Sequence, residues 1–281
     1  MTLAGINLEP TNVLEALASL EAAAERLRAA GDPRAIFPDV YAIITAQVAA
    51  QIHPHSGFFL EPAFISRLSG RFAQRYLETL EASLSGRPQD CTAWSVAYAY
   101  ARRDGTLPLQ HAALAISAHI NFDLAHGLHA TLRELGITHD APALARYKRD
   151  HDAVNHLLAT SMPLAIRRLA RRYGCRATRH LRGRHLLPWA SRRMLSTLQH
   201  WRETVWSDMV GLLEASGGAT REQIRQRMER RSRRIGYHLS KMSALNLVLR
   251  ILHPLDPLYG TPEAALEGMH RPRSSVADGL R

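Results

Sequence analysis

Several polar side chains of the kinds that bind metal ions or move protons lie on one predicted helix. The run reads His119-Ile-Asn121-Phe-Asp123-Leu-Ala-His126-Gly-Leu-His129. Positions i, i+4 and i+7 share a helix face, so His119, Asp123 and His126 point the same way. An imidazole and a carboxylate four residues apart can bind one divalent metal ion. A buried hydrogen-bonded pair of His119 and Asp123 is the competing structural interpretation.

A second segment, Asp150-His151-Asp152-Ala-Val-Asn155, carries the same residue types on another predicted helix. His151 and Asn155 again share a helix face. If the two helices lie together, we expect them to hold one divalent ion, zinc or magnesium. The expected metal ligands are His119, Asp123, His151 and Asn155.

Three further residues are candidate catalytic groups around that ion. Asp150 or Asp152 would act as a base or orient a ligand, while the ion lowers the pKa of bound water. Asn121 is the third candidate, although on an ideal helix it points away from His119.

The elements that must position these residues are all predicted to be helices. Apolar residues recur at helical spacing, Gly and Pro separate the runs, and we find no alternating strand pattern. The expected helices span 14–29, 37–52, 61–83, 92–103, 108–135, 142–172, 188–216 and 220–234. Pro163 predicts a break or kink in the sixth of them. The fold class is therefore all-α, a multi-helix bundle.

Glycines and charge divide the chain into three predicted parts. Residues 1–216 form a helical core domain, and Gly217-Gly218 is the clearest linker. Residues 219–268 form a basic helical extension, and residues 269–281 are expected to be a disordered tail.

The composition points to anionic partners and a reducing compartment. The 281 residues carry a formal charge of +11, which is typical of proteins that bind phosphate esters, nucleic acid or an acidic lipid surface. The arginine and alanine content could instead reflect a GC-rich bacterial genome. The cysteines, Cys91 and Cys175, are too few and too far apart for a disulfide framework. Without a signal-peptide pattern or an apolar run near ~18 residues, we expect a cytoplasmic protein.

Four segments resemble an uncharacterised family of helical proteins from actinobacteria, over roughly residues 36–215. They are Gly57-Phe-Phe-Leu-Glu-Pro-Ala-Phe, Arg71-Phe-Ala-Gln-Arg-Tyr, Ala118-His-Ile-Asn-Phe-Asp-Leu and Val154-Asn-His-Leu-Leu-Ala. The resemblance implies a helical fold and a shared site around His119, Asn121, Asp123, Asp150 and Asn155. It implies no particular activity.

A second pattern resembles the zinc-dependent phospholipase C and single-strand nuclease superfamily, which is all-helical and binds a metal cluster. The residues that match its motif are Asp39, His53, His119, Asp123, His129, His151 and Asn155. Asn155 stands where that family has a carboxylate, and Met1 stands where it has a tryptophan ligand. The resemblance implies a phosphoester-cleaving metal site.

Three hypotheses for the function follow. The first is a metal-assisted enzyme that acts on a phosphorylated or otherwise anionic small molecule. The second is a natural-product cyclase or terpene-synthase-like enzyme with an apolar helical pocket, although a DDxxD motif is absent. The third is a non-enzymatic protein that binds nucleic acid or a membrane surface through its basic C-terminal region.

Overall fold

The computed structural model of this chain describes residues 1–53, 55–139, 142–174 and 186–241. In the last of these ranges, side chains are described from residue 192 onward. Its elements are α1 (Val13–Ala29), the 3-10 turn η1 (Pro33–Ala35), α2 (Ile36–Gln51), α3 (Pro62–Leu84), α4 (Thr92–Ala101), α5 (Pro108–Ala118), the π-helical segment η2 (His119–Asp123), α6 (Leu124–Glu134), α7 (Leu144–Arg172), α9 (Leu186–Glu214) and α10 (Gly218–Lys241). Every regular element in these ranges is helical, which confirms the all-α prediction.

Local signals explain where the first helices begin. The side chain of Asn12 caps α1 by accepting hydrogen bonds from the backbone N–H groups of Leu14 and Glu15, both at 3.0 Å. Glu15 returns the contact by accepting from the N–H of Thr11 at 2.8 Å. Pro62 occupies the first turn of α3, where its missing N–H costs no helical hydrogen bond.

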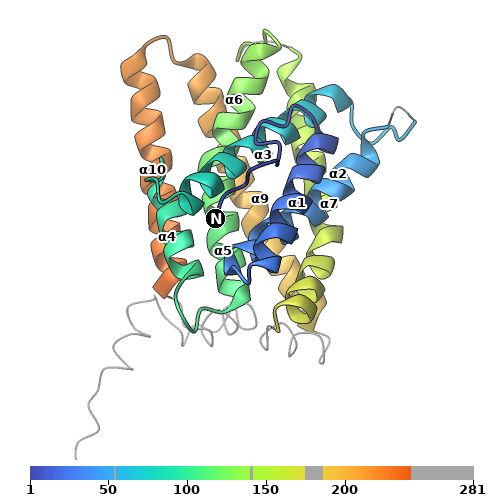
Figure 1. Ribbon diagram of the computed structural model, residues 1–281. Helices are drawn as coiled ribbons and strands as arrows, with labels where there is room; N and C mark the ends of the chain where they lie inside the picture. Colours follow the sequence, from blue (N-terminus) through green and yellow to red (C-terminus); the bar gives the residue numbers. More distant parts are fainter. Residues whose placement is uncertain (54, 140–141, 175–185, 242–281) are drawn as a thin grey trace, which may run out of the picture.

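The helices pack as one bundle around a central helical rod, which is formed by α5, η2 and α6 (Figure 1). α5, η2 and α6 follow one another without interruption, as expected for a single helical run over 108–135. α1 packs on α2 and α3, α2 packs on α7, and α9 packs on both α6 and α7. As a result η2 contacts α3, α9 and α10 in addition to its own neighbours along the rod.

α7 stays helical through Pro163 as far as Arg172, so no break occurs where the proline predicted a break or kink. α10 begins at Gly218, the second residue of the predicted linker, and extends beyond the predicted end at residue 234. It packs on α4, α5, α9 and η2, with Met228 fully buried. The part of the predicted extension after residue 241 and the predicted tail at 269–281 lie outside the described residues.

None of the helices in the described ranges is long and apolar enough to cross a membrane.

Candidate functional site

His119 and Asp123 form a buried hydrogen-bonded pair within η2. Nδ1 of His119 lies 2.9 Å from Oδ2 of Asp123, and Trp94 donates its indole N–H to the same oxygen at 2.9 Å. Nε of Arg75 is 3.6 Å from the other carboxylate oxygen. π-helical turns are rare and occur often at functional sites. Here the π turn carries the two residues that the sequence analysis placed at the centre of the site.

The surroundings of this pair keep the imidazole neutral and the carboxylate charged. Burial lowers the pKa of His119 more strongly than the hydrogen bond and charge of Asp123 raise it. Burial opposes ionisation of Asp123, but its hydrogen bond and Coulombic interaction with His119, the charge of Arg75 and the hydrogen bond from Trp94 together outweigh this and lower its pKa. Because an ionised carboxylate only accepts, the ring proton of His119 sits on Nδ1. Nε2 is then a free base.

The ring of His119 is held in place by aromatic neighbours. The Phe72 ring stacks on it with 3.5 Å between centroids and 6° between planes, and Tyr41 meets it edge-on at 4.8 Å. Nε2 of His119 is buried and has no hydrogen-bond partner among the described residues. A buried nitrogen without a partner is costly, so its presence in a fixed ring points to a ligand.

His119 lines a mostly apolar cavity of about 100 Å³. Its apolar lining comprises Phe37, Val40, Tyr41, Ile44, Val48, Ile65, Leu68, Phe72, Ile116, Ile120, Leu124, Val154 and Leu158. The polar side chains in its wall are Thr45, Ser69, His119, His151 and Arg202. The hydroxyls of Thr45 and Ser69 donate to carbonyls one turn earlier on their own helices. The two histidines and the arginine therefore carry the polar chemistry of the cavity.

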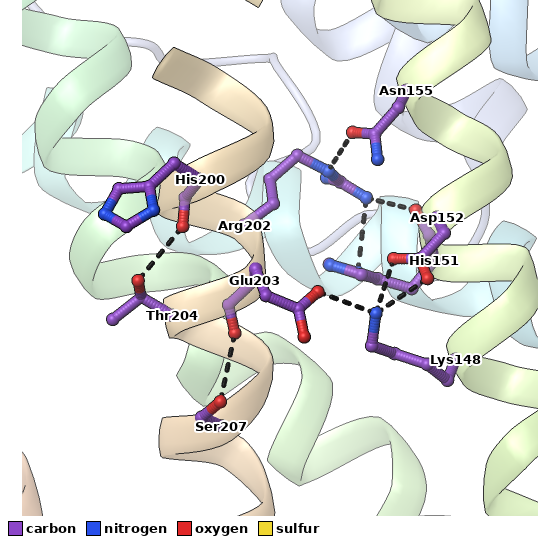
Figure 2. A network of polar contacts seen from close by, with 9 residues as sticks. All are labelled: Lys148, His151, Asp152, Asn155, His200, Arg202, Glu203, Thr204 and Ser207. Carbon is purple, nitrogen blue, oxygen red and sulfur yellow. Dashed lines mark hydrogen bonds and ion pairs between the residues drawn. The ribbon is translucent and has the colours of Figure 1, made fainter. Parts of the chain in front are cut away.

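Arg202 of α9 reaches across to α7, where it contacts His151 and Asn155 (Figure 2). Its Nε donates to Oδ1 of Asn155 at 2.9 Å, and one terminal nitrogen donates to the carbonyl of His151 and lies 3.2 Å from the Nδ1 of that residue. A guanidinium has only donors, so Nδ1 of His151 accepts and the ring proton sits on Nε2. That N–H is buried and without a partner in the described structure. The two histidines thus present a base and a donor, respectively.

Arg202 is a buried cation that forms no ion pair with a carboxylate in the described part of the chain. Its exposure is 6 %, and burial lowers its pKa to about 10. No carboxylate of the described residues forms an ion pair with it. Asp152, whose charge raises the pKa of Arg202, accepts instead from Lys148 at 2.6 and 2.8 Å, and Lys148 also contacts Glu203 (Figure 2). Asp152, predicted to be catalytic, is therefore part of a partly exposed salt bridge.

The other two predicted catalytic residues have structural roles in this geometry. Asp150 is fully buried, and its two oxygens accept the backbone N–H groups of Leu60 and Glu61 at 2.8 and 2.6 Å. It thereby fixes the start of α3 and is not among the residues that line the cavity. Asn121 donates to the carbonyl of Ser117 at 3.1 Å and does not line the cavity.

The predicted four-ligand metal set is not assembled. The oxygens of Asp123 contact His119, Trp94 and Arg75, while a guanidinium lies between His151 and Asn155. Across the described ranges, no three His, Cys, Asp or Glu side chains lie close enough to hold a metal ion. Zinc or magnesium therefore stays a prediction that this geometry does not support.

Asp39, the first residue of the phospholipase-like pattern, lies in a cluster that includes none of the pattern's other residues. The Asp39 carboxylate accepts from Arg168, Arg172 and Tyr173 at 2.8, 2.8 and 3.1 Å, in a cluster of its own. Two arginine guanidinium groups therefore compensate the charge of the buried Asp39 carboxylate. Sequence reasoning also missed Arg202 and Trp94, whose partners come from other helices.

Comparison with known proteins places the chain in one family. The family model "Family of unknown function (DUF5995)" matches residues 13–242, so this chain belongs to that family. The expectation of an uncharacterised helical family is confirmed, and the similarity to zinc-dependent phospholipases is not shown. Neither a curated protein nor a solved structure matches the chain.

Proposed function

We propose that the cavity binds a small, largely apolar carboxylic acid and that the His119–Asp123 pair acts on it as a general base. The observation that carries the proposal is the set of three polar groups in an apolar wall. They are the unpartnered base on His119, the unpartnered donor on His151 and the guanidinium of Arg202 without a carboxylate. A ligand with an anionic head and an apolar body complements all three.

Arg202 supplies the positive charge that the sequence analysis assigned to a divalent ion. A guanidinium binds a carboxylate through charge-assisted N–H donors, which Arg202 can offer from the terminal nitrogen that contacts neither His151 nor Asn155, and the N–H of His151 adds a further donor. Because the cavity is apolar, the attraction between the two charges is stronger than in water. A carboxylate fits better than a phosphate, which would bring more charge and more acceptors than these two side chains can satisfy.

His119 then faces the body of the ligand as a base. It would take a proton from a hydroxyl or an activated C–H of the ligand onto Nε2, while the electron pair stays on the ligand. The imidazolium that forms keeps its Nδ1–H bond to Asp123, whose charge stabilises it. Arg202 and His151 lie where developing negative charge on the ligand would be stabilised. This is the opening step of an isomerase or lyase reaction.

The apolar lining suits an apolar substrate, as the cyclase hypothesis requires, better than it suits a phosphorylated substrate. The volume argues against a terpenoid, since the cavity of about 100 Å³ is smaller than an engineered cavity of about 150 Å³ that binds benzene. We therefore favour an acid with a short branched chain.

The test is a binding experiment with 3-methylbutanoate and its neutral isostere 3-methylbutanamide, followed by NMR titration of the full chain. We expect the carboxylate to bind about tenfold or more tightly than the amide, because a charge-assisted hydrogen bond contributes about 1.5–3 kcal/mol. Arg202→Met should abolish this preference. The matched control is Arg192→Met, which removes an exposed arginine of the same helix and should change nothing.

The same titration tests His119. A bound anion should raise the pKa of His119, because opposite charge favours the imidazolium. Equal binding of acid and amide by the wild-type protein would overturn the proposed ligand class. Carboxylate binding without any change at His119 would overturn its role as the base.

A further inference from the structure

α10 presents two faces of opposite character. Its apolar face is packed into the bundle, where Met228 is fully buried. On the same face, a Cβ added at Gly236 would lie 3.9 Å from Ala93 of α4. On the outer face Arg230, Arg233 and Arg234 are exposed. In the part of the chain that the structure describes, these three arginines form no ion pair, unlike most of their neighbours.

The outer face carries no negative charge over its C-terminal half. The stretch from Arg230 to Lys241 contains neither Asp nor Glu. The acidic residues of α10 lie earlier and are engaged, since Glu222 pairs with Arg225 and Glu229 accepts from a backbone N–H of α4. Positive charge therefore accumulates along one stripe, and at a rise of 1.5 Å per residue this stripe is about 16 Å long.

An aromatic ring lies within this stripe. Tyr237 is 50 % exposed, and the ammonium group of Lys241 lies 4.3 Å from the centre of its ring. A groove runs along the same face, lined by Arg227, Arg230, Arg231, Arg233, Arg234 and Tyr237. Proteins that bind single-stranded nucleic acid use basic grooves with exposed aromatic side chains. The cationic side chains contact the phosphates, and a base stacks on the aromatic ring.

We propose that this outer face of α10 binds single-stranded nucleic acid through Arg230, Arg233, Arg234 and Tyr237. The inference is independent of the proposed small-molecule site. The alternative anionic partner, a membrane surface, fits less well. Helices that bind in the bilayer interface insert large apolar side chains, whereas Tyr237 is the only exposed large apolar residue of the described α10.

The test measures fluorescence anisotropy of labelled 20-residue oligothymidylate and oligouridylate with the full chain at 50, 100 and 200 mM KCl. The variant Arg230→Gln/Arg233→Gln/Arg234→Gln removes three cations. Affinity should fall at least tenfold at low salt. Each phosphate contact contributes about 0.7 to the slope of log affinity against log salt, so the slope should decrease by about 2.

The matched control is Arg87→Gln/Arg102→Gln/Arg103→Gln, which removes the same charge from exposed arginines elsewhere. It should change the affinity less than twofold. Tyr237→Ala should weaken binding about fivefold or more with an unchanged salt slope, because stacking contributes about 1–3 kcal/mol per base.

Several results would overturn the inference. Equal losses in the two triple variants would show an effect of net charge alone. A 20-base-pair duplex that binds as tightly as the single strand would refute the single-strand assignment. Binding to phosphatidylglycerol vesicles without binding to either oligonucleotide would make the face a membrane contact. A wild-type chain that binds none of these probes would also refute the proposal. Preference for the thymidylate or the uridylate would tell DNA from RNA.

Discussion

Replacing Arg202 by methionine should leave the stability of the protein almost unchanged, although the side chain is buried. Burial lowers the pKa of Arg202 from 12.5 to about 10. One pKa unit corresponds to about 1.4 kcal/mol, so holding the charge in the fold costs about 3 kcal/mol. Methionine removes this cost. It also removes hydrogen bonds to Asn155 and to the carbonyl and ring of His151, each worth about 1 kcal/mol net. The two effects cancel to within about 1 kcal/mol.

The variant Arg231→Met serves as the comparison for the expected change in the free energy of unfolding. Arg231 is also largely buried, but it forms an ion pair with the buried Asp208 and donates to the carbonyl of Asn121 at 3.2 Å. Removing one partner of a buried ion pair typically costs about 3–5 kcal/mol. Asp208 keeps its contact with Arg227 at 2.8 Å, so we expect a loss of at least about 2 kcal/mol.

Urea unfolding followed by circular dichroism gives both free energies of unfolding. The reasoning is refuted if Arg202→Met loses as much stability as Arg231→Met, because Arg202 would then be a structural residue whose contacts outweigh its burial. It is upheld if the stability stays the same while binding of 3-methylbutanoate is lost. Such a variant separates function from folding, as expected for a cation kept for a ligand.

Three further predictions concern other parts of the molecule. Gly70→Ala should destabilise the fold by a few kcal/mol, because the added Cβ would lie 2.5 Å from a backbone carbon of the N-terminal segment. Gly127→Ala, where the added Cβ would have its nearest neighbour at 3.7 Å, should be neutral or stabilising, and urea unfolding of both variants measures the difference. Burial lowers the pKa of His111 to about 4, so the unfolded chain takes up a proton first as the pH falls below about 6.5. Stability should therefore drop by up to about 3 kcal/mol between pH 6.5 and 4, and unfolding curves of His111→Gln should show a smaller drop; an identical drop would contradict the assignment. Finally, Asp123→Asn removes a charge that raises the pKa of His119, so NMR titration should find that pKa lower still, and a rise would speak against a charged Asp123.

Much of the helical layout could be predicted because its signals are local. Gly, Pro and apolar periodicity act within a few residues, and Asn12 caps α1 through its own neighbours. The π turn at η2 could not be predicted, because its residue types suit an ordinary α-helix and its surroundings are five different elements. α10 extends beyond its predicted end at residue 234 for a similar reason. Residues 235–241 are held helical by packing on α4 and α5, which the basic run before them does not indicate.

The candidate site shows the same division between local and long-range signals. His119 and Asp123 are four residues apart, and the competing interpretation of them as a buried hydrogen-bonded pair is confirmed. Asp150 has a residue type suited to catalysis, but its partners lie about ninety positions earlier at Leu60 and Glu61. No local pattern distinguishes a carboxylate that caps a helix from one that moves a proton.

The four predicted metal ligands do not come together because their residue types are ambiguous. Imidazole nitrogens and amide oxygens are ligands for a divalent ion, but they are equally good acceptors for a guanidinium. His151 and Asn155 therefore predict that a cation will lie between them, and the sequence pattern cannot tell which cation. The fold fills that position with Arg202, which is one of many arginines in a chain with 36 cationic residues. A guanidinium fixed by α9 still offers positive charge to a ligand, but it cannot activate water as a metal ion does. Because Arg202 lies where the sequence pattern predicts a metal ion, we propose proton transfer at His119 in place of hydrolysis at a metal.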